Sequence, residues 1–149
     1  MADLKLVALD DEDLTVISAT MQDAVFKVED MDFDHTSGQF LLAANRFVWE
    51  NIKSKRTKTH ERHRSNIVFK RVQNIKLRGI DRSKSDEVLS LLAIKFHKNE
   101  DGPDGQIELV MSANAGVSAG ILLDVECIEV QLTDTGGAWE TKFKPSHGS

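Results

Sequence analysis

Apolar residues recur at every second position along most of the chain after Val25, and this spacing constrains the fold more than any other feature. It predicts β-strands joined by turns where glycine and polar residues cluster, as from His35 to Gly38. Between Phe40 and Trp49 both faces of the predicted strand are apolar, which indicates a strand covered on both sides. Arg46 interrupts this strand, and we expect its charge to reach a carboxylate, a carbonyl or water, because burying it unpaired would be costly.

One amphipathic helix is predicted before the strands. Leu14, Ile17, Met21 and Ala24 are three or four positions apart, which places them on one face of a helix. Asp10 precedes this face and can accept a hydrogen bond from an amide of the first turn, where acidic residues also favour the helix dipole. We therefore interpret the acidic run near Asp10 as a helix start and not as a metal site.

Two segments of the first half resemble two segments of the second half, in the same order. Gly38-Gln39 and the strand that follows match Gly105-Gln106 and its strand, 67 positions later. The stretch "IVFKRVQNIKL" matches "GILLDVECIEV", 53 positions later. We expect an internal repeat with halves at about residues 25–80 and 88–134. The two offsets differ, which makes the stretch from Glu50 to Arg64 an insertion between two strands of the first half.

The apolar alternation shifts by one position inside each half, near Val72 and near Cys127, so a bulge or a tight turn is expected in both. Another strand is expected from about Val88.

The length of 149 residues is that of one domain. These features predict a single α+β domain, mainly antiparallel β, whose two ββ-plus-strand halves form a sandwich or a partly closed barrel beside the N-terminal helix. The last residues, about 144–149, are expected to be disordered.

Charge is distributed in three blocks. Residues 1–44 have a net charge of −8, residues 45–84 one of +10 and residues 85–149 one of −7, within a total of −5. An acidic chain does not have the overall balance of a general nucleic-acid binder. The opposite charges of the blocks either neutralise one another on the folded surface or leave the basic block to bind an external anionic partner.

The insertion, taken as a loop from Asn51 to Arg64, is the predicted contact site for such a partner. Its candidate anion-binding residues are Lys53, Lys55, Arg56, Lys58, His60, Arg62, His63 and Arg64. Cations at this density attract phosphates or an acidic protein surface. No aromatic residue lies between Trp49 and Phe69, so the loop lacks platforms on which bases could stack. The spacing of His60 and His63 could hold a metal ion on a helix, but the surrounding cations oppose it, and we expect no metal and no cofactor.

The sequence Gly116-Val117-Ser118-Ala119-Gly120 matches the nucleophile motif of serine hydrolases. In those enzymes a helix follows the serine, whereas the alternating residues after Gly120 predict a strand. Asp124 or Asp134 and then His147 follow the serine in the chain order of a catalytic acid and base, but His147 lies in a polar tail. A hydrolase using Ser118 is therefore the least favoured of the functions considered.

The N-terminal "LKLVALDDEDLTVISATMQDAV", "NRFVWE", the basic connection, "VFKRVQNIKLRGID" and "ILLDVECIEVQLTD" together resemble a small family of uncharacterised alphaproteobacterial proteins, a domain of unknown function. The resemblance spans about Leu4 to Asp134. It implies a bacterial, intracellular protein of one domain and supplies no activity, cofactor or functional residue.

A non-catalytic binding module that uses the basic loop is the leading functional hypothesis. Its partner would be an acidic protein surface or a second copy of the chain, and an electrostatic nucleic-acid or anionic-ligand binder is the alternative. The single cysteine, Cys127, fits a reducing compartment, and no window is apolar enough for a membrane span, so we expect a cytoplasmic protein.

Overall fold

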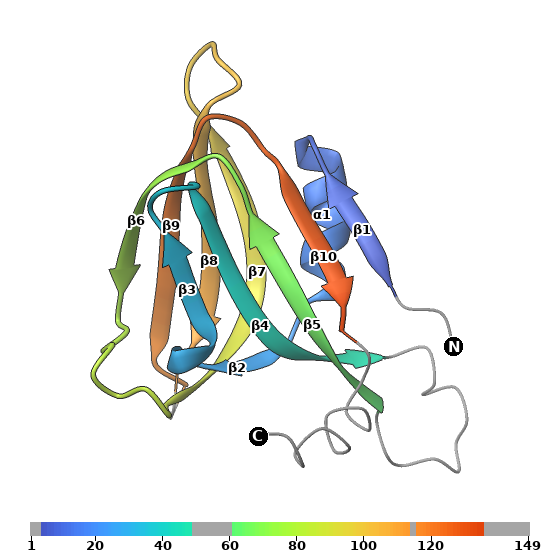
Figure 1. Ribbon diagram of the computed structural model, residues 1–149, viewed down its shortest axis with the longest axis vertical. Helices are drawn as coiled ribbons and strands as arrows, with labels where there is room; N and C mark the ends of the chain where they lie inside the picture. Colours follow the sequence, from blue (N-terminus) through green and yellow to red (C-terminus); the bar gives the residue numbers. More distant parts are fainter. Residues whose placement is uncertain (1–3, 49–60, 114–115, 136–149) are drawn as a thin grey trace.

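The computed structural model describes residues 4–48, 61–113 and 116–135, which form one α-helix and ten antiparallel strands (Figure 1). Within these residues, no helix has the length and apolar character needed to cross a bilayer. The elements in chain order are β1 (Lys5–Ala8), α1 (Asp11–Thr20), β2 (Val25–Lys27), the 3₁₀ turn η1 (Val28–Asp30), β3 (Met31–Asp34), β4 (Gln39–Val48), β5 (Glu61–Phe69), β6 (Val72–Arg78), β7 (Val88–Lys98), β8 (Gly105–Ser112), β9 (Ser118–Val125) and β10 (Val130–Asp134).

Helix α1 begins after Asp10, whose side chain accepts a hydrogen bond from the amide of Asp13 at 2.8 Å. Leu14 and Ile17 are buried on its inner face. The hydroxyl of Ser18 accepts a hydrogen bond from the amide of Ile94 in β7 at 2.8 Å. The helix therefore lies against β7.

All ten strands belong to one sheet in the order β1-β10-β5-β4-β2-β7-β8-β9-β6, with β3 paired to β4 beside β2. Since β1 and β6 at the two ends do not pair with each other, the sheet is not closed. Figure 1 shows the sheet curling until its β6 end lies beside β3. The result is one α+β unit, mainly antiparallel β, whose core lies inside the curl and includes the ring contact of Phe40 and Phe69, with centroids 6.0 Å apart.

The predicted breaks in alternation are corners where the chain leaves one strand pair and joins another. β5 leads through Lys70 and Arg71 into β6, which pairs with β9. β9 leads through residues 126–129 into β10, which pairs with β5. Arg71 has a φ of 60°, as a tight corner requires. The internal repeat itself stays a prediction.

The expected strand from about Val88 is confirmed as β7, and the strand expected from Phe40 to Trp49 is β4, with Trp49 outside the described residues. The prediction that the basic loop extends to Arg64 is wrong. β5 begins at Glu61, so Arg62, His63 and Arg64 belong to a strand and not to a loop. Their backbones pair with residues 45–47 of β4, which extends to Val48.

Candidate ligand-binding site

The sheet opens between β3 and β6. β6 is the last strand of the sheet and pairs with β9 alone, and β3 pairs with β4 alone. One edge of each strand therefore has no neighbouring strand among the residues that the structure describes. These two edges face each other across the opening.

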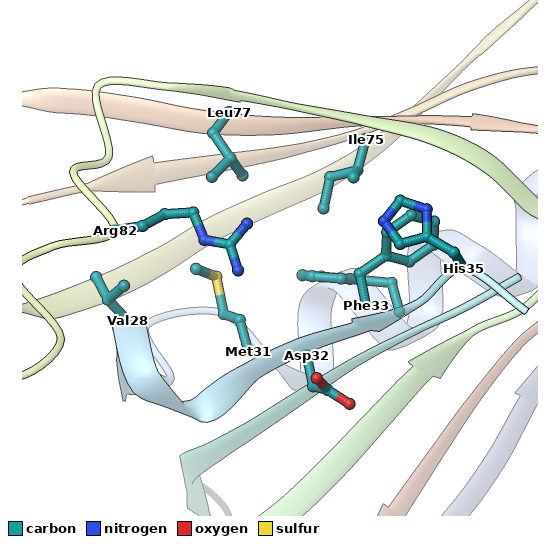
Figure 2. A pocket seen from close by; sticks show the side chains of 9 residues that line it. Val28, Met31, Asp32, Phe33, His35, Ile75, Leu77 and Arg82 are labelled. Atoms are coloured by element: carbon teal, nitrogen blue, oxygen red, sulfur yellow. The ribbon is translucent and has the colours of Figure 1, made fainter.

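A cavity of about 300 Å³ lies in this opening (Figure 2). Met31 and Phe33 line it from β3, and Ile75 and Leu77 line it from β6. All four side chains are half-buried. Each pair is two positions apart on its strand, so both of its members point to the same face, and the polar neighbours Asp32 and Lys76 are exposed. Alternation within the two short strands therefore gives the cavity two facing apolar sides, while Asp32, His35 and Arg82 also line it.

Arg82 brings a positive charge to one end of the cavity. It lies in the loop between β6 and β7, where the Asp81 carboxylate accepts hydrogen bonds from the Ser83 hydroxyl at 2.6 Å and the Ser83 amide at 3.0 Å. These two hydrogen bonds lower the pKa of Asp81 below its ordinary value. The loop is tied to η1 by hydrogen bonds to the carbonyls of Ser85 and Glu87, so the backbone that carries Arg82 is held in place.

The Arg82 guanidinium extends between the apolar side chains of the two strands, with Leu77 on one side and Met31 on the other (Figure 2). Across the part of the chain that the structure describes, no hydrogen bond or ion pair joins it to another residue. A guanidinium presents five donors that fit a carboxylate or a phosphate. This cavity therefore combines an apolar wall with donors that a bound anion could use.

The other end of the opening is closed by backbone. The amide of Val72, at the start of β6, donates a hydrogen bond to the carbonyl of Gly38 at 2.9 Å. Gly38 has a φ of +70°, and a β-carbon on it would lie 3.0 Å from the Val72 carbonyl oxygen. His35 lies at this end with its ring centroid 4.4 Å from that of Phe33. The opening thus has a closed end near Gly38 and a cationic end at Arg82.

The predicted anion-binding residues are only partly placed by the structure. Lys53, Lys55, Arg56, Lys58 and His60 lie outside the described residues. On β5, Arg62 is exposed, and Arg64 is half-buried with its guanidinium 3.4 Å from the Asp30 carboxylate. The imidazole of His63 lies 3.7 Å from the Asp134 carboxylate. Two of the three described candidates are therefore beside acidic groups of the chain itself.

Asp134 is the centre of a buried polar cluster. Its carboxylate accepts hydrogen bonds from Arg46 Nε at 3.0 Å, from Arg46 Nη2 at 2.9 Å and from the Ser65 hydroxyl at 2.6 Å. Burial raises the pKa of the Asp134 carboxyl, but the hydrogen bonds from Arg46 and Ser65 and the charge of Arg46 outweigh burial and hold that pKa below its ordinary value. The expectation that Arg46 reaches a carboxylate is confirmed. The cluster joins β4, β5 and β10, and the Asp134 carboxylate also accepts a hydrogen bond from the Leu4 amide at 3.3 Å.

Ser118 is an exposed residue at the start of β9, where it pairs with Ser112 of β8. Strand follows it, as the alternation after Gly120 predicts. Asp124 accepts hydrogen bonds from Gln106 and Asn74, and His147 lies outside the described residues. The surroundings of Ser118 do not have the strand-to-helix turn that activates a serine nucleophile.

Sequence reasoning did not identify Arg82 or the cavity. Arg82 stands in a polar stretch of no recognisable motif, and the four apolar wall residues look like ordinary strand residues. These residues differ from other strand residues only because β3 and β6 each have an open edge in the folded sheet, which leaves their inward side chains half-buried. No pattern in the sequence records which strands become the two sides of an opening.

The fold and the cavity define a small antiparallel β protein with one helix and a ligand-sized opening between two edge strands. The chain belongs to the family described as protein of unknown function (DUF2948), whose family model matches residues 4–147. This match confirms the resemblance to an uncharacterised family. No curated protein and no solved structure matches the chain.

Proposed function

We propose that the protein is a non-catalytic binding module whose ligand is a small molecule with an apolar body and an anionic group. The ligand occupies the cavity between β3 and β6, with its apolar part against Met31, Phe33, Ile75 and Leu77 and its anion on Arg82. The observation that carries the proposal is the guanidinium of Arg82, which extends between the apolar side chains of β3 and β6 without an acidic partner among the described residues.

Solvation of the cavity wall favours a ligand with an apolar body. Half-buried apolar side chains gain from a ligand that removes them from water, at roughly 25 cal/mol for each Å² covered. Arg82 is exposed, so a bound anion would form a charge-assisted hydrogen bond with it that solvent partly screens. A cavity of about 300 Å³ is at the lower end of the range for ligand sites. An acyl chain with a carboxylate has this size and chemistry.

Catalysis is less well supported, because the polar groups of the cavity do not converge. The Asp32 carboxylate points away from the centre, and His35 lies at the end distant from Arg82 (Figure 2). A general acid or base must come within hydrogen-bond reach of the reacting group and of its partners. A single cation beside apolar side chains is sufficient to bind an anionic ligand, whereas catalysis would need further polar groups close to it.

Calorimetric titration with decanoate, and with decanol as the uncharged ligand of the same chain length, tests the proposal. Decanoate should bind more tightly than decanol by about tenfold, the lower end of the value of a hydrogen bond to a charged group, because Arg82 is exposed. Arg82→Gln should remove this preference. Lys84→Gln, which removes an exposed cation from the same loop, should retain it. Absence of decanoate binding would contradict the proposal.

A second candidate function uses the basic stretch from Asn51 to Arg64. It is favoured by the exposed Arg62 at the start of β5, which continues the run of cations in the sequence. The partner would be an acidic protein surface, a second copy or, less favourably, nucleic acid. Charge reversal at Lys55, Arg56 and Lys58 should abolish such binding, and added salt should weaken it. Binding that is unchanged by both would exclude this function.

The finer features of the sequence interpretation also remain proposals. These are the internal repeat, the bacterial origin of the family and a cytoplasmic location. The crossing of β6 to β9 and of β10 to β5 supports the repeat, because each half sends its last strand to pair with the other half.

A further inference from the structure

The edges of β3 and β6 offer backbone groups as well as side chains to a ligand. Alternate residues of an edge strand direct their amide and carbonyl groups away from the paired neighbour. The Val72 amide donates to the Gly38 carbonyl, and the Met31 amide, at the start of β3, donates to the Val28 carbonyl. In the described residues, the other backbone groups on the open side of either strand make no backbone hydrogen bond. The walls of the cavity are therefore bordered on two sides by free donors and acceptors.

The two strands run in opposite directions along the opening. The start of β6 is tied to Gly38, after the end of β3, while Arg82 follows β6 and lies beside Val28, before β3. The arrows of β3 and β6 in Figure 1 point in opposite directions. An extended chain parallel to β6 would thus be antiparallel to β3 and would end at Arg82.

We propose that the ligand is an extended peptide segment with apolar residues at alternate positions and a free C-terminal carboxylate. The peptide adds as a strand in the opening, its inward side chains contact Ile75, Leu77, Met31 and Phe33, and its carboxylate binds the Arg82 guanidinium. Strand addition of this kind obtains affinity from main-chain hydrogen bonds and specificity from every second side chain. The inference rests on the proposed function, because it assigns a ligand to the same cavity.

The backbone edges favour a peptide over an acyl chain. An acyl chain covers the apolar wall and pairs with Arg82, but it has no groups for the amides and carbonyls that border the cavity. A peptide supplies both sets of contacts at the spacing of a strand. The charge of Arg82 fixes the direction of the peptide, because only a terminal carboxylate places an anion at the end of the backbone.

Amide hydrogen exchange measured by NMR distinguishes the two ligands. The probes are decanoate and a pool of short synthetic peptides with apolar residues at every second position, prepared with free and with amidated C-termini. With the free peptides, the exchange rates of amides on the open edges of β3 and β6 should fall by about tenfold or more. Decanoate should leave these exchange rates unchanged.

Two substitutions test the role of the carboxylate in the same experiment. The native protein and Lys84→Gln should bind the free peptides about tenfold more tightly than the amidated ones. Arg82→Gln should bind both equally. If decanoate binds and neither peptide pool does, the peptide assignment is overturned while the proposed ligand site stands. If neither decanoate nor peptide binds, both are overturned.

Discussion

Arg46 and Asp134 form a forked ion pair that joins β4 to β10. Nε of Arg46 donates to one carboxylate oxygen at 3.0 Å, and Nη2 donates to the other at 2.9 Å. The side chain of Asp134 is 1 % exposed, so the pair is nearly excluded from water. The pair thus ties β4 to β10 across β5, the strand that pairs with both of them.

Removal of one partner should therefore be costly. Arg46→Met is expected to lower the free energy of unfolding by about 3–5 kcal/mol, because it leaves the Asp134 carboxylate buried without its cation. Urea denaturation followed by circular dichroism measures the change. Arg78→Gln is the matched control, since the guanidinium of Arg78 is exposed and 3.8 Å from Glu108. The control should change stability by less than about 1 kcal/mol. Equal effects of the two substitutions would contradict this account of the buried pair.

Stability should also depend on the ionisation of Asp134. Its pKa in the folded protein lies below the ordinary value of 3.8, so the unfolded chain binds the proton more readily than the folded chain. The stabilisation is fully present above the unfolded pKa and is lost as pH falls through the folded pKa. The difference in unfolding free energy between the native protein and Asp134→Asn should be constant near neutral pH and should shrink below about pH 4. A difference that does not change in acid would show that Asp134 is not the group concerned.

Gly38 and Gly116 allow the closed end of the opening to be tested. Both have positive φ, +70° and +72°, but a β-carbon on Gly38 meets the Val72 carbonyl at 3.0 Å and one on Gly116 meets nothing within 4 Å. Alanine at either position costs about 1–2 kcal/mol of backbone strain. Gly38→Ala should cost more than Gly116→Ala in chemical denaturation, since it also pushes β6 away from the turn. An equal loss would mean that this contact contributes nothing.

A charge in the cavity wall should prevent ligand binding. Leu77→Asp places a carboxylate among the apolar side chains that the ligand contacts, and the affinity for decanoate should fall by about tenfold or more. Lys76→Gln, on the outer face of the same strand, should bind as the native protein does. Both variants should keep the native circular dichroism spectrum, because Leu77 is only half-buried. Equal affinity of the two variants would place the ligand elsewhere.

The local elements of this fold follow from short-range patterns. The acid at Asp10 predicts the start of α1, and alternation predicts β4 and β7 within one residue at the ends that the structure describes. The need of a strand arginine for a partner predicts an ion pair for Arg46. Each of these three predictions depends either on residues that are neighbours in the sequence or on the cost of an unpaired charge. Both kinds of information are contained in one short stretch of the chain.

The start of β5 could not be read in this way. Arg62, His63 and Arg64 have no apolar alternation, and they are held in the strand by backbone pairing with residues 45–47 of β4. The outer face of β4 is likewise only half-buried at Leu41 and Ala43, although its sequence suggests cover on both sides. In both places, partners distant in the sequence decide the structure.

The candidate site is further removed from the sequence. It exists because the sheet curls until β3 faces β6, and because the loop after β6 returns Arg82 to the same opening. Curvature is a property of the whole sheet, accumulated over many strand pairs. The residues of the site are ordinary in composition, and their arrangement gives them their chemistry.

Two-dimensional amide NMR spectra recorded during a titration with decanoate test whether the opening between β3 and β6 binds a ligand. The amide signals of β3, β6 and the loop carrying Arg82 should shift together and saturate, while those of β1 and β10 at the far end of the sheet should stay in place. Shifts confined to β1 and β10, or no saturable shift at all, would contradict the assignment of the opening between β3 and β6 as the ligand site.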